Sequence, residues 1–497
     1  MSSQKKLAAA LDVITRLQAE GHQAYLAGGC VRDLLLGRTP SDYDVATSAT
    51  PDRVLQLFPR CFAVGAHFGV VLVSASGGED SCQLSALSSQ PSAPPQVELA
   101  PPLVAQVGQV VTEVATFRSD GVYSDGRHPD AVRYTLSAAE DVQRRDFTVN
   151  GLLLDPLRGG GVLEEIFTNP QKLRATVEDH VGGLADLDAG VVRAIGQPAD
   201  RFEEDHLRML RAVRFTARLG FALDPATAMA MRTLASRIAA VSRERVRDEL
   251  TKMLVEGHAR RAFELLDETG LLGEVLPEVA RMKGVEQPPQ YHPEGDVWQH
   301  VLLLLEQLEP GCSKTLAWAA LLHDVGKPAT FQRAADRIRF NGHAEVGVAI
   351  ASELCSRFRF SNEETEQIVT LVAHHMRFME ALRMKESTIK RFLRLDRFEE
   401  HLALHRMDCL AGSGYLENWK FMQERWQSTS AESFHPQPLL TGHDLIAAGY
   451  RSGPEFRDLL NAAEDAQLEG RIHTVEEALA LLRSSFGEPA LRNAPKG

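Results

Sequence analysis

The apolar pattern changes once along this chain, and the change limits what the chain can fold into. Up to about residue 155, short apolar runs such as Ala24–Ala27 alternate with helical spacing, as in the opening segment Leu7–Leu17. Beyond about residue 156, apolar side chains recur almost only at helical spacing, as in Val297–Leu308. Short bounded runs indicate strands, and a period near 3.6 residues indicates helices. We therefore expect a small α/β head followed by an all-α remainder.

The chain is also too long for one hydrophobic core. It has 497 residues, whereas single cores stop growing at about 250–300 residues. Between about residues 74 and 102 the composition turns to Ser, Ala, Pro and Gly, which predicts a flexible insertion within the head. The expected divisions are a head at 1–155, a helical neck at 156–270, a third helical domain at 271–440 and a C-terminal helical tail at 441–497.

Charge is distributed unevenly along the chain. The formal net charge is −13, yet residues 201–261 hold thirteen Lys and Arg against eight Asp and Glu. Proteins usually bind nucleic-acid phosphates through such a local excess of basic side chains. We interpret this segment as a basic neck able to hold RNA along one stripe. A solvated helix face is the alternative.

Targeting and cysteine signals point to an ordinary intracellular protein. The N-terminus has no apolar signal region, and the sequence has no apolar run of about 18 residues. We therefore expect a cytoplasmic protein with no membrane partner. The six cysteines show no CxxC spacing, which argues against a disulfide framework or a cysteine-based zinc site.

Asp42 and Asp44 form an Asp-x-Asp pair in an expected strand, Asp42–Ala46. Alternation along a strand points both carboxylates to the same face. Mg²⁺ takes one or two protein carboxylates and completes its shell with phosphates and water. We predict that the pair is catalytic and binds Mg²⁺, although such a pattern by itself is most often a surface turn.

Two clusters flank this pair. Gly28 and Gly29 lie where a strand runs into a helix, so their backbone N–H groups could bind phosphate, and Arg32 could add a charged contact. Downstream, the segment Arg144–Asn150 places two guanidinium groups beside an acid and an amide, which could bind ribose and phosphate. The alternatives are a tight turn for the glycines and a structural ion-pair network for the second cluster.

Four motifs in order carry a resemblance to a known family. They are Gly-Gly-x-Val-Arg-Asp, Asp-x-Asp, Arg-Arg-Asp-Phe-Thr-x-Asn and Glu-Asp-x-x-Arg, and they lie between about Tyr25 and Phe221. This set resembles the bacterial tRNA nucleotidyltransferase/poly(A) polymerase family, the class II CCA-adding enzymes. The resemblance implies a polymerase-β-like nucleotidyltransferase head. The site residues that it implies are Asp42 and Asp44 for two Mg²⁺ ions, Gly29 and Arg32 for the triphosphate, and Arg145 with Asp146 for the ribose.

The fourth motif concerns base selection. Asp205 and Arg208 stand three residues apart at an expected helix start, which the segment Glu204–Arg208 opens, so a capping salt bridge is the simple interpretation. The resemblance implies instead that they form the protein template that pairs with incoming CTP or ATP. Further basic residues on nearly the same face are suited to a triphosphate or an RNA backbone. These residues are Arg211, Arg214 and Arg218.

The C-terminal half contains a second set of candidate metal ligands. In chain order it contains His300, His323-Asp324, His343, His374-His375 and Asp408. The order His, His-Asp, Asp resembles the HD-domain phosphohydrolases, so residues 271–440 are expected to form an HD-type domain. A retained scaffold without a working site is the alternative. The four expected positions are His300, His323, Asp324 and Asp408, with His343 and either His374 or His375 as possible additions.

Three functions follow as hypotheses. The first is a tRNA nucleotidyltransferase that adds CCA, or part of it, to tRNA 3′ ends from CTP and ATP. The second is a poly(A) polymerase of the same fold; those enzymes commonly have proline where this chain has His206, so we favour the first. The third is an HD metal phosphohydrolase whose head only binds RNA. Mg²⁺ is the expected cofactor, and a second divalent metal is expected if the HD site is active.

Overall fold

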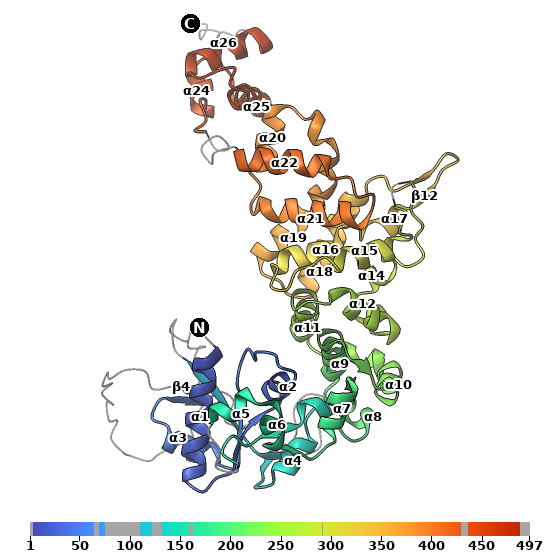
Figure 1. The fold of residues 1–497 in the computed structure, drawn as a ribbon. Coiled ribbons are helices and arrows are strands. Elements are labelled where there is room, and N and C mark those ends of the chain that lie inside the picture. Colours follow the sequence, from blue (N-terminus) through green and yellow to red (C-terminus); the bar gives the residue numbers. More distant parts are fainter. Residues whose placement is uncertain are drawn as a thin grey trace, which may run out of the picture. The chain divides into compact units, whose positions relative to one another are not determined.

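The computed structural model describes residues 3–63, 69–74, 110–121, 132–158, 163–290, 292–428 and 436–487 (Figure 1). The chain divides into two compact units. Unit 1 consists of Met1–Ser242 with Thr269–Leu271, and unit 2 consists of Arg243–Glu268 with Leu272–Gly497. The flexible insertion predicted at about residues 74–102 falls almost wholly outside the described residues.

A mixed sheet forms the centre of unit 1. Its order is β3-β4-β5-β2-β1-β8-β9; β2 and β5 run parallel, and every other neighbouring pair is antiparallel. Its strands are β1 (Ala24–Ala27), β2 (Val45–Thr47), β3 (Cys61–Ala63), β4 (Val70–Ser74), β5 (Val111–Thr116), β8 (Leu152–Leu154) and β9 (Val177–Asp179). The small pairs β6 (Arg118–Asp120) with β7 (Val132–Tyr134) and β10 (Val191–Val192) with β11 (Ala222–Leu223) lie outside this sheet.

Helices cover the sheet and continue the unit. Helix α1 buries Val13, Ile14 and Leu17 and contacts β1, β2 and β5, as the helical spacing of its apolar residues predicts. The helices of unit 1 are α1 (Ser3–Ala19), α2 (Gly29–Leu35), α3 (Pro51–Leu57), α4 (Ala138–Gln143), η2 (Thr148–Asn150), α5 (Leu163–Thr168), α6 (Pro170–Ala175), α7 (Gly183–Ala189), α8 (Pro198–Glu204), α9 (Leu207–Leu219), α10 (Pro225–Leu234) and η3 (Ala235–Ala240).

Two element boundaries differ from the sequence-based expectation. The expected strand Asp42–Ala46 begins only at Val45, so the acidic pair lies in the segment that leads into β2. The expected helix start at Glu204 is also wrong, because α8 ends there and α9 begins at Leu207. In both places the polar side chains stand just before the element, where they are available for capping or for ligands.

Unit 2 is almost entirely helical. With the α/β head, this arrangement confirms the expected fold class. From residue 243 on, the elements are α11 (Arg243–Val255), α12 (Ala259–Glu268), α13 (Leu271–Val275), α14 (Pro277–Ala280), α15 (Val297–Leu305), α16 (Lys314–Leu322), α17 (Lys327–Thr330), β12 (Gln332–Arg333), β13 (Ile338–Arg339), α18 (His343–Arg357), α19 (Asn362–His374), η4 (His375–Arg383), α20 (Glu386–Leu393), α21 (Phe398–Ala411), α22 (Glu417–Ser428), α24 (Gly442–Ala447), α25 (Glu455–Leu468) and α26 (Val475–Phe486).

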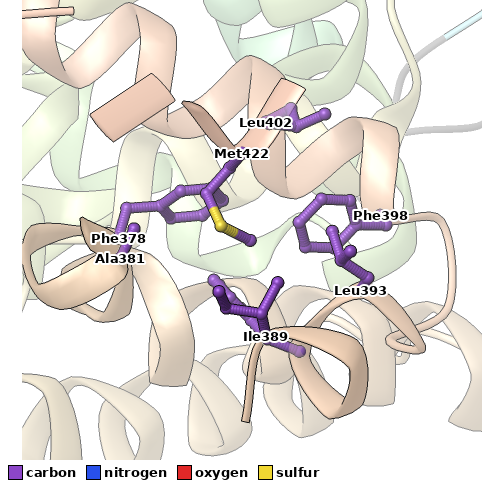
Figure 2. Close-up of a cluster of buried hydrophobic side chains, with 8 residues drawn as sticks. Phe378, Ala381, Ile389, Leu393, Phe398, Leu402 and Met422 are labelled. Atoms are coloured by element: carbon purple, nitrogen blue, oxygen red, sulfur yellow. The ribbon is translucent and has the colours of Figure 1, made fainter. Parts of the chain in front are cut away.

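An aromatic and aliphatic cluster joins four of these elements. Figure 2 shows Phe378 of η4, Ile389 of α20, Phe398 of α21 and Met422 of α22 packed together, and Phe378 and Phe398 lie with ring centroids 6.1 Å apart. Because η4 begins at His375 and α21 carries Asp408, the cluster fixes the two elements from which these side chains project.

The C-terminal segment packs around a separate cluster. Leu445 of α24, Leu459 of α25 and Leu482 of α26 are buried together. Arg391 of α20 pairs with Glu464 and Asp465 of α25. Among the described residues, no helix combines the length and the apolar character needed to cross a bilayer.

Candidate functional sites

Three carboxylates converge at the edge of β2 and β5 in unit 1. Asp42 and Asp44 precede β2, and the parallel register aligns Val45 with Val114. Asp44 and Glu113, each one residue earlier, are therefore neighbours across the two strands. All three acidic side chains are exposed to solvent.

Burial and neighbouring negative charge raise the pKa of two of these carboxylates, Asp44 and Glu113. Partial burial, followed by the charges of Glu113 and Asp42, raises the pKa of Asp44 to about 6. Burial and Asp42 also raise the pKa of Glu113. Lys6 of α1 pairs with Asp42 at 2.8 Å but does not remove the excess of negative charge. An oxygen-only, partly exposed set of this kind fits a hard divalent cation.

The turn between β1 and α2 lies beside these acids. Gly28 has φ 75° and ψ −129°, a backbone conformation that other residues rarely adopt. A Cβ at Gly28 would lie 3.3 Å from Nη1 of Arg145. The Arg145 charge also lowers the pKa of Asp44 against the larger effects that raise it. Arg145 therefore lies close to both the glycine turn and the acidic pair.

Arg32, expected to contact a triphosphate, points inward in this structure. Its side chain is 2% exposed. Nη1 donates to Oδ1 of Asn150 at 2.5 Å, and Nε donates to Oδ1 of Asp33 at 2.8 Å. The bond to Asn150 joins α2 to η2. A phosphate contact by Arg32 stays a prediction.

Asp146 forms the centre of the second basic cluster. Its Oδ2 accepts from Nη2 of Arg211 at 2.6 Å, and its Oδ1 accepts from Nδ2 of Asn150 at 3.1 Å. Burial alone would raise the pKa of Asp146, but Arg211, Asn150 and Arg208 together lower it to about 2. Arg145 pairs instead with Asp141 at 2.9 Å. The ion-pair network considered from the sequence is therefore present, and a ribose contact from this cluster stays a prediction.

The proposed template pair lies at the α8–α9 junction. Oδ1 of Asp205 accepts from the backbone N–H of Leu207, the first residue of α9, at 3.0 Å. Arg208 pairs with Glu204 at 2.5 Å and donates to the carbonyl oxygen of Arg144 at 3.0 Å.

Basic side chains of α2 and α9 gather around one aromatic ring. The guanidinium carbons of Arg32, Arg211 and Arg214 lie 5.2, 5.3 and 4.3 Å from the centroid of Phe215, within the range of cation–π attraction. Arg218 reaches Asp33 at 3.6 Å. The structure thus brings three of the predicted arginines, Arg32, Arg211 and Arg214, together around Phe215.

In unit 2, four predicted ligands converge. Nε2 of His300 lies 3.0 Å from Oδ1 of Asp408 and 3.9 Å from Oδ2 of Asp324. Nε2 of His323 lies 3.2 Å from the same Asp324 oxygen and 4.0 Å from Oδ1 of Asp408. Apart from Asp408, these side chains are buried. The four positions expected from the sequence therefore form one cluster.

Two further histidines join this cluster. Nε2 of His343 and Nε2 of His375 lie 3.6 and 3.8 Å from Oδ1 of Asp324. The close approach depends on Gly326, because a Cβ there would lie 2.1 Å from the carbonyl oxygen of His343. His374, the other possibility, packs instead near Phe392. Of the two adjacent histidines, His375 belongs to the cluster.

Charge compensation around the cluster is strong. Burial opposes ionisation of Asp324, but Lys327 at 2.7 Å and His323 hold its pKa well below the usual range. Burial would likewise lower the pKa of His300, yet hydrogen bonds to Asp408 and Glu294 raise it to about 9. Imidazole and carboxylate donors together suit divalent transition metals.

A pocket of about 470 Å³ opens onto this cluster. Lys327, Arg337 and Arg339 supply positive charge, and Met376 and Met379 supply apolar surface. Such a lining suits a ligand that carries both a phosphate and an apolar or aromatic group.

Three family models match successive parts of the chain. The family described as "Poly A polymerase head domain" matches residues 24–87 and 102–193. The "Probable RNA and SrmB-binding site of polymerase A" matches residues 220–283, and "HD domain" matches residues 296–410.

A relative in Thermus thermophilus, the "CC-adding tRNA nucleotidyltransferase", is 32% identical over 475 residues, covering 92% of this chain and 93% of the relative. The chain belongs to the tRNA nucleotidyltransferase/poly(A) polymerase family. "CCA-adding enzyme" relatives include one from Lactobacillus gasseri, 33% identical over 60% of this chain and 64% of its own length. The chain thus spans less than two thirds of that relative.

Solved structures in this family share the fold. The Bacillus stearothermophilus CCA-adding enzyme in complex with CTP has a TM-score of 0.66 at 24% identity and covers 96% of this chain and 98% of its own. The Thermotoga maritima CCA-adding enzyme complexed with tRNA has a TM-score of 0.54 at 17% identity, with 96% coverage of both chains.

Two residues of the candidate sites were missed from the sequence. Glu113 lies in an ordinary alternating strand pattern, and only the pairing of β5 with β2 brings it to Asp44. Glu294 accepts from Nδ1 of His300 at 2.7 Å and of His292 at 2.9 Å. The short spacing in His292-Pro-Glu294, just before His300, was the available signal.

Proposed function

We propose that this chain is a tRNA nucleotidyltransferase that adds CCA, or part of it, to the 3′ end of tRNA. In this reaction the terminal hydroxyl of the RNA attacks the α-phosphate of CTP or ATP, and pyrophosphate leaves. The observation that carries the proposal is the convergence of Asp42, Asp44 and Glu113 beside the Gly28 turn and Arg145. Further support comes from the family and from the activity named for the Thermus thermophilus relative.

The residues present fit Mg²⁺. The three side chains offer only oxygen donors, reach solvent, and carry negative charge in excess, as the pKa of Asp44 near 6 indicates. When bound, Mg²⁺ would supply activation of the attacking hydroxyl and stabilisation of the leaving pyrophosphate. We propose Asp42 and Asp44 as the catalytic ligands, with Glu113 as a third carboxylate.

The chain's other residues would orient the substrates. Gly28 and Gly29 leave backbone N–H groups accessible to a triphosphate, and Arg145 places a positive charge beside them. Asp146 forms an ion pair with Arg211. Asp205 and Arg208 remain the proposed template, in which one acceptor and one donor read the base edge.

The test uses tRNA lacking its 3′-terminal nucleotides. CTP alone, ATP alone and both together are supplied with Mg²⁺, and the products are resolved to single nucleotides. Addition of one to three nucleotides supports the proposal, and the nucleotide requirement separates full CCA addition from CC or A addition. Long A tracts on any RNA would favour the poly(A) polymerase alternative. A protein of this family is expected to act in the cytoplasm.

A second candidate function belongs to unit 2. The pocket that joins Lys327, Arg337 and Arg339 to the His and Asp cluster favours hydrolysis of a phosphomonoester or a 2′,3′-cyclic phosphate. Release of phosphate, or opening of the cyclic phosphate, on a short RNA with a modified 3′ end tests this function. His323→Ala should abolish it. If Asp42→Ala left every RNA-dependent activity unchanged, the third hypothesis, a hydrolase with an RNA-binding head, would stand.

A further inference from the structure

The helix η4 exposes a stripe of apolar side chains. Because a 3-10 helix has about three residues per turn, side chains three positions apart stand one above another. Phe378 and Ala381 share one face and are buried in the cluster of Figure 2. Met376, Met379 and Leu382 share a different face and are 43%, 59% and 58% exposed. Helix η4 therefore carries an apolar face that is open to solvent.

This apolar stripe begins inside the unit 2 pocket. Met376 and Met379 line the pocket, and Leu382 follows one turn farther along η4. The segment between α21 and α22 adds an aromatic ring, because Tyr415 is 76% exposed. Three residues later, Nδ2 of Asn418 donates to the carbonyl oxygen of Met379 at 3.4 Å. The exposed apolar surface thus leads from the pocket outward along η4.

A short β-hairpin supplies positive charge to the same pocket. It pairs β12 with β13 antiparallel, and Figure 1 shows it projecting beyond helix α17. Residues 332–339 hold three Arg and one Asp. Arg337 and Arg339 line the pocket, and Asp336 pairs with them at 3.9 and 2.8 Å. One carboxylate shared by two guanidinium groups leaves a net positive charge beside the apolar stripe.

The combination of charge and apolar surface favours one kind of partner. Guanidinium groups such as those of Arg337 and Arg339 bind phosphate oxygens in a forked geometry. The side chains of Met379 and Tyr415 offer polarisable or aromatic surfaces on which nucleobases can stack. A single-stranded nucleic acid brings a phosphate and a base with every nucleotide. A stripe that leads out of a phosphate-binding pocket can therefore follow several nucleotides of one strand.

We propose that η4, Tyr415 and the 332–339 hairpin bind the single-stranded 3′ end of an RNA and direct its terminal phosphate into the unit 2 pocket. Arg337 and Arg339 contact the phosphates of the strand, while its bases stack against the apolar stripe. The inference rests on the second candidate function for the terminal phosphate, but binding of the strand requires no hydrolysis. It makes the substrate of unit 2 an RNA strand rather than a free nucleotide.

The test measures binding of a fluorescent adenosine RNA of about eight nucleotides, ending in a 3′-phosphate, to the full chain by anisotropy. EDTA prevents hydrolysis during the measurement. The double variant Arg337→Ala with Arg339→Ala should bind about tenfold more weakly. Loss of two phosphate contacts should also reduce the dependence of log affinity on log salt by about 1.4. Met379→Asp, which removes a stacking surface, should weaken binding about tenfold.

Two matched variants serve as controls. Arg333→Ala lies on the same hairpin, but Arg333 pairs with Glu286 and does not line the pocket. Ile446→Asp changes an exposed apolar residue of α24. Neither substitution should change the affinity. A photoreactive thiouridine next to the 3′-phosphate should crosslink to the peptide that contains residues 376–382 or to the one that contains Tyr415.

Several results would overturn the inference. They are equal affinity of the pocket variants and their controls, crosslinks confined to unit 1, and binding of adenosine 3′-phosphate as tight as that of the strand. Self-association that Met379→Asp abolishes, with RNA binding unchanged, would assign the stripe to a second copy of the chain. Tight, variant-sensitive RNA binding without phosphate release in Co²⁺ would reject the hydrolytic function and leave the inference standing.

Discussion

The two candidate metal sites differ in the type of their ligand atoms and in the exposure of those atoms to solvent. In unit 1, Asp42, Asp44 and Glu113 offer exposed oxygen atoms. In unit 2, buried imidazoles such as His300 and His323 are held in place by oxygens that contact their Nδ1 atoms. An exposed oxygen site suits an ion that arrives with a triphosphate and leaves with pyrophosphate. A buried nitrogen site suits a resident ion. We therefore expect the two sites to support separate chemistries.

The largest expected effect comes from removing a head carboxylate. Asp44→Asn should lower nucleotide addition to tRNA by about 1000-fold or more, because the remaining acids hold the cation poorly. Phosphate release by the unit 2 site should not change. Asp52→Asn, an exposed acid in the first turn of α3, is the matched control. Substantial nucleotide addition by the Asp44→Asn variant would contradict a catalytic cation site in the head.

Glu113→Gln tests whether the third carboxylate belongs to the same site. It should lower addition by about 100-fold, since it removes one of the charges that crowd Asp44. The pKa of Asp44 should also fall, which a carboxyl NMR titration can measure. Glu140→Gln, an exposed acid of α4, should change neither quantity. An active Glu113→Gln variant with an unchanged Asp44 titration would exclude Glu113 from the site.

Asp146→Asn tests the framework beneath the head site. The pKa of Asp146 is about 2 in the folded chain and about 3.9 in an unfolded one. Its ionised form therefore stabilises the fold above about pH 4, by about 2 kcal/mol, and this contribution is lost as pH falls toward 2. Urea unfolding should show the variant less stable than the parent at pH 7. The difference in free energy of unfolding between the parent and the variant should be smaller at pH 3. A difference that does not change with pH would contradict the account.

The smallest expected effect concerns Glu294. Replacing it by glutamine weakens its hold on Nδ1 of His300, 2.7 Å away, and such outer partners change metal affinity by about 10–100-fold. We expect about tenfold weaker Co²⁺ binding by calorimetry and unchanged nucleotide addition. Glu286→Gln, at the exposed Arg333 ion pair, is the control. Loss of all Co²⁺ binding would instead indicate a structural role for Glu294.

Local motifs explain what the sequence alone could predict. The strand Ala24–Ala27, the opening helix and the helix before His323 are all observed, because apolar periodicity and capping act over a few residues. The acidic pair and the glycine turn are separated by few residues, so their proximity was also predictable.

Contacts between distant residues were not predictable. Glu113 approaches Asp44 only through the pairing of two strands about 70 residues apart in the sequence. Arg32 turns inward to bind Asn150, which lies 118 positions away in the sequence. The choice between His374 and His375 depended on where α19 gives way to η4. One residue more or less there rotates a different imidazole toward Asp324, and no local pattern specifies that boundary.

The comparison of the two sites can be tested in one preparation. The full chain is stripped with a chelator and given Mg²⁺ alone, after which addition to tRNA lacking its 3′ end and release of phosphate from a 3′-phosphorylated RNA are both measured. The account predicts that Mg²⁺ restores addition of one to three nucleotides, while phosphate release returns only after a transition metal such as Co²⁺ is supplied. Failure of Mg²⁺ to restore addition, or restoration of both activities together by Mg²⁺, would contradict it.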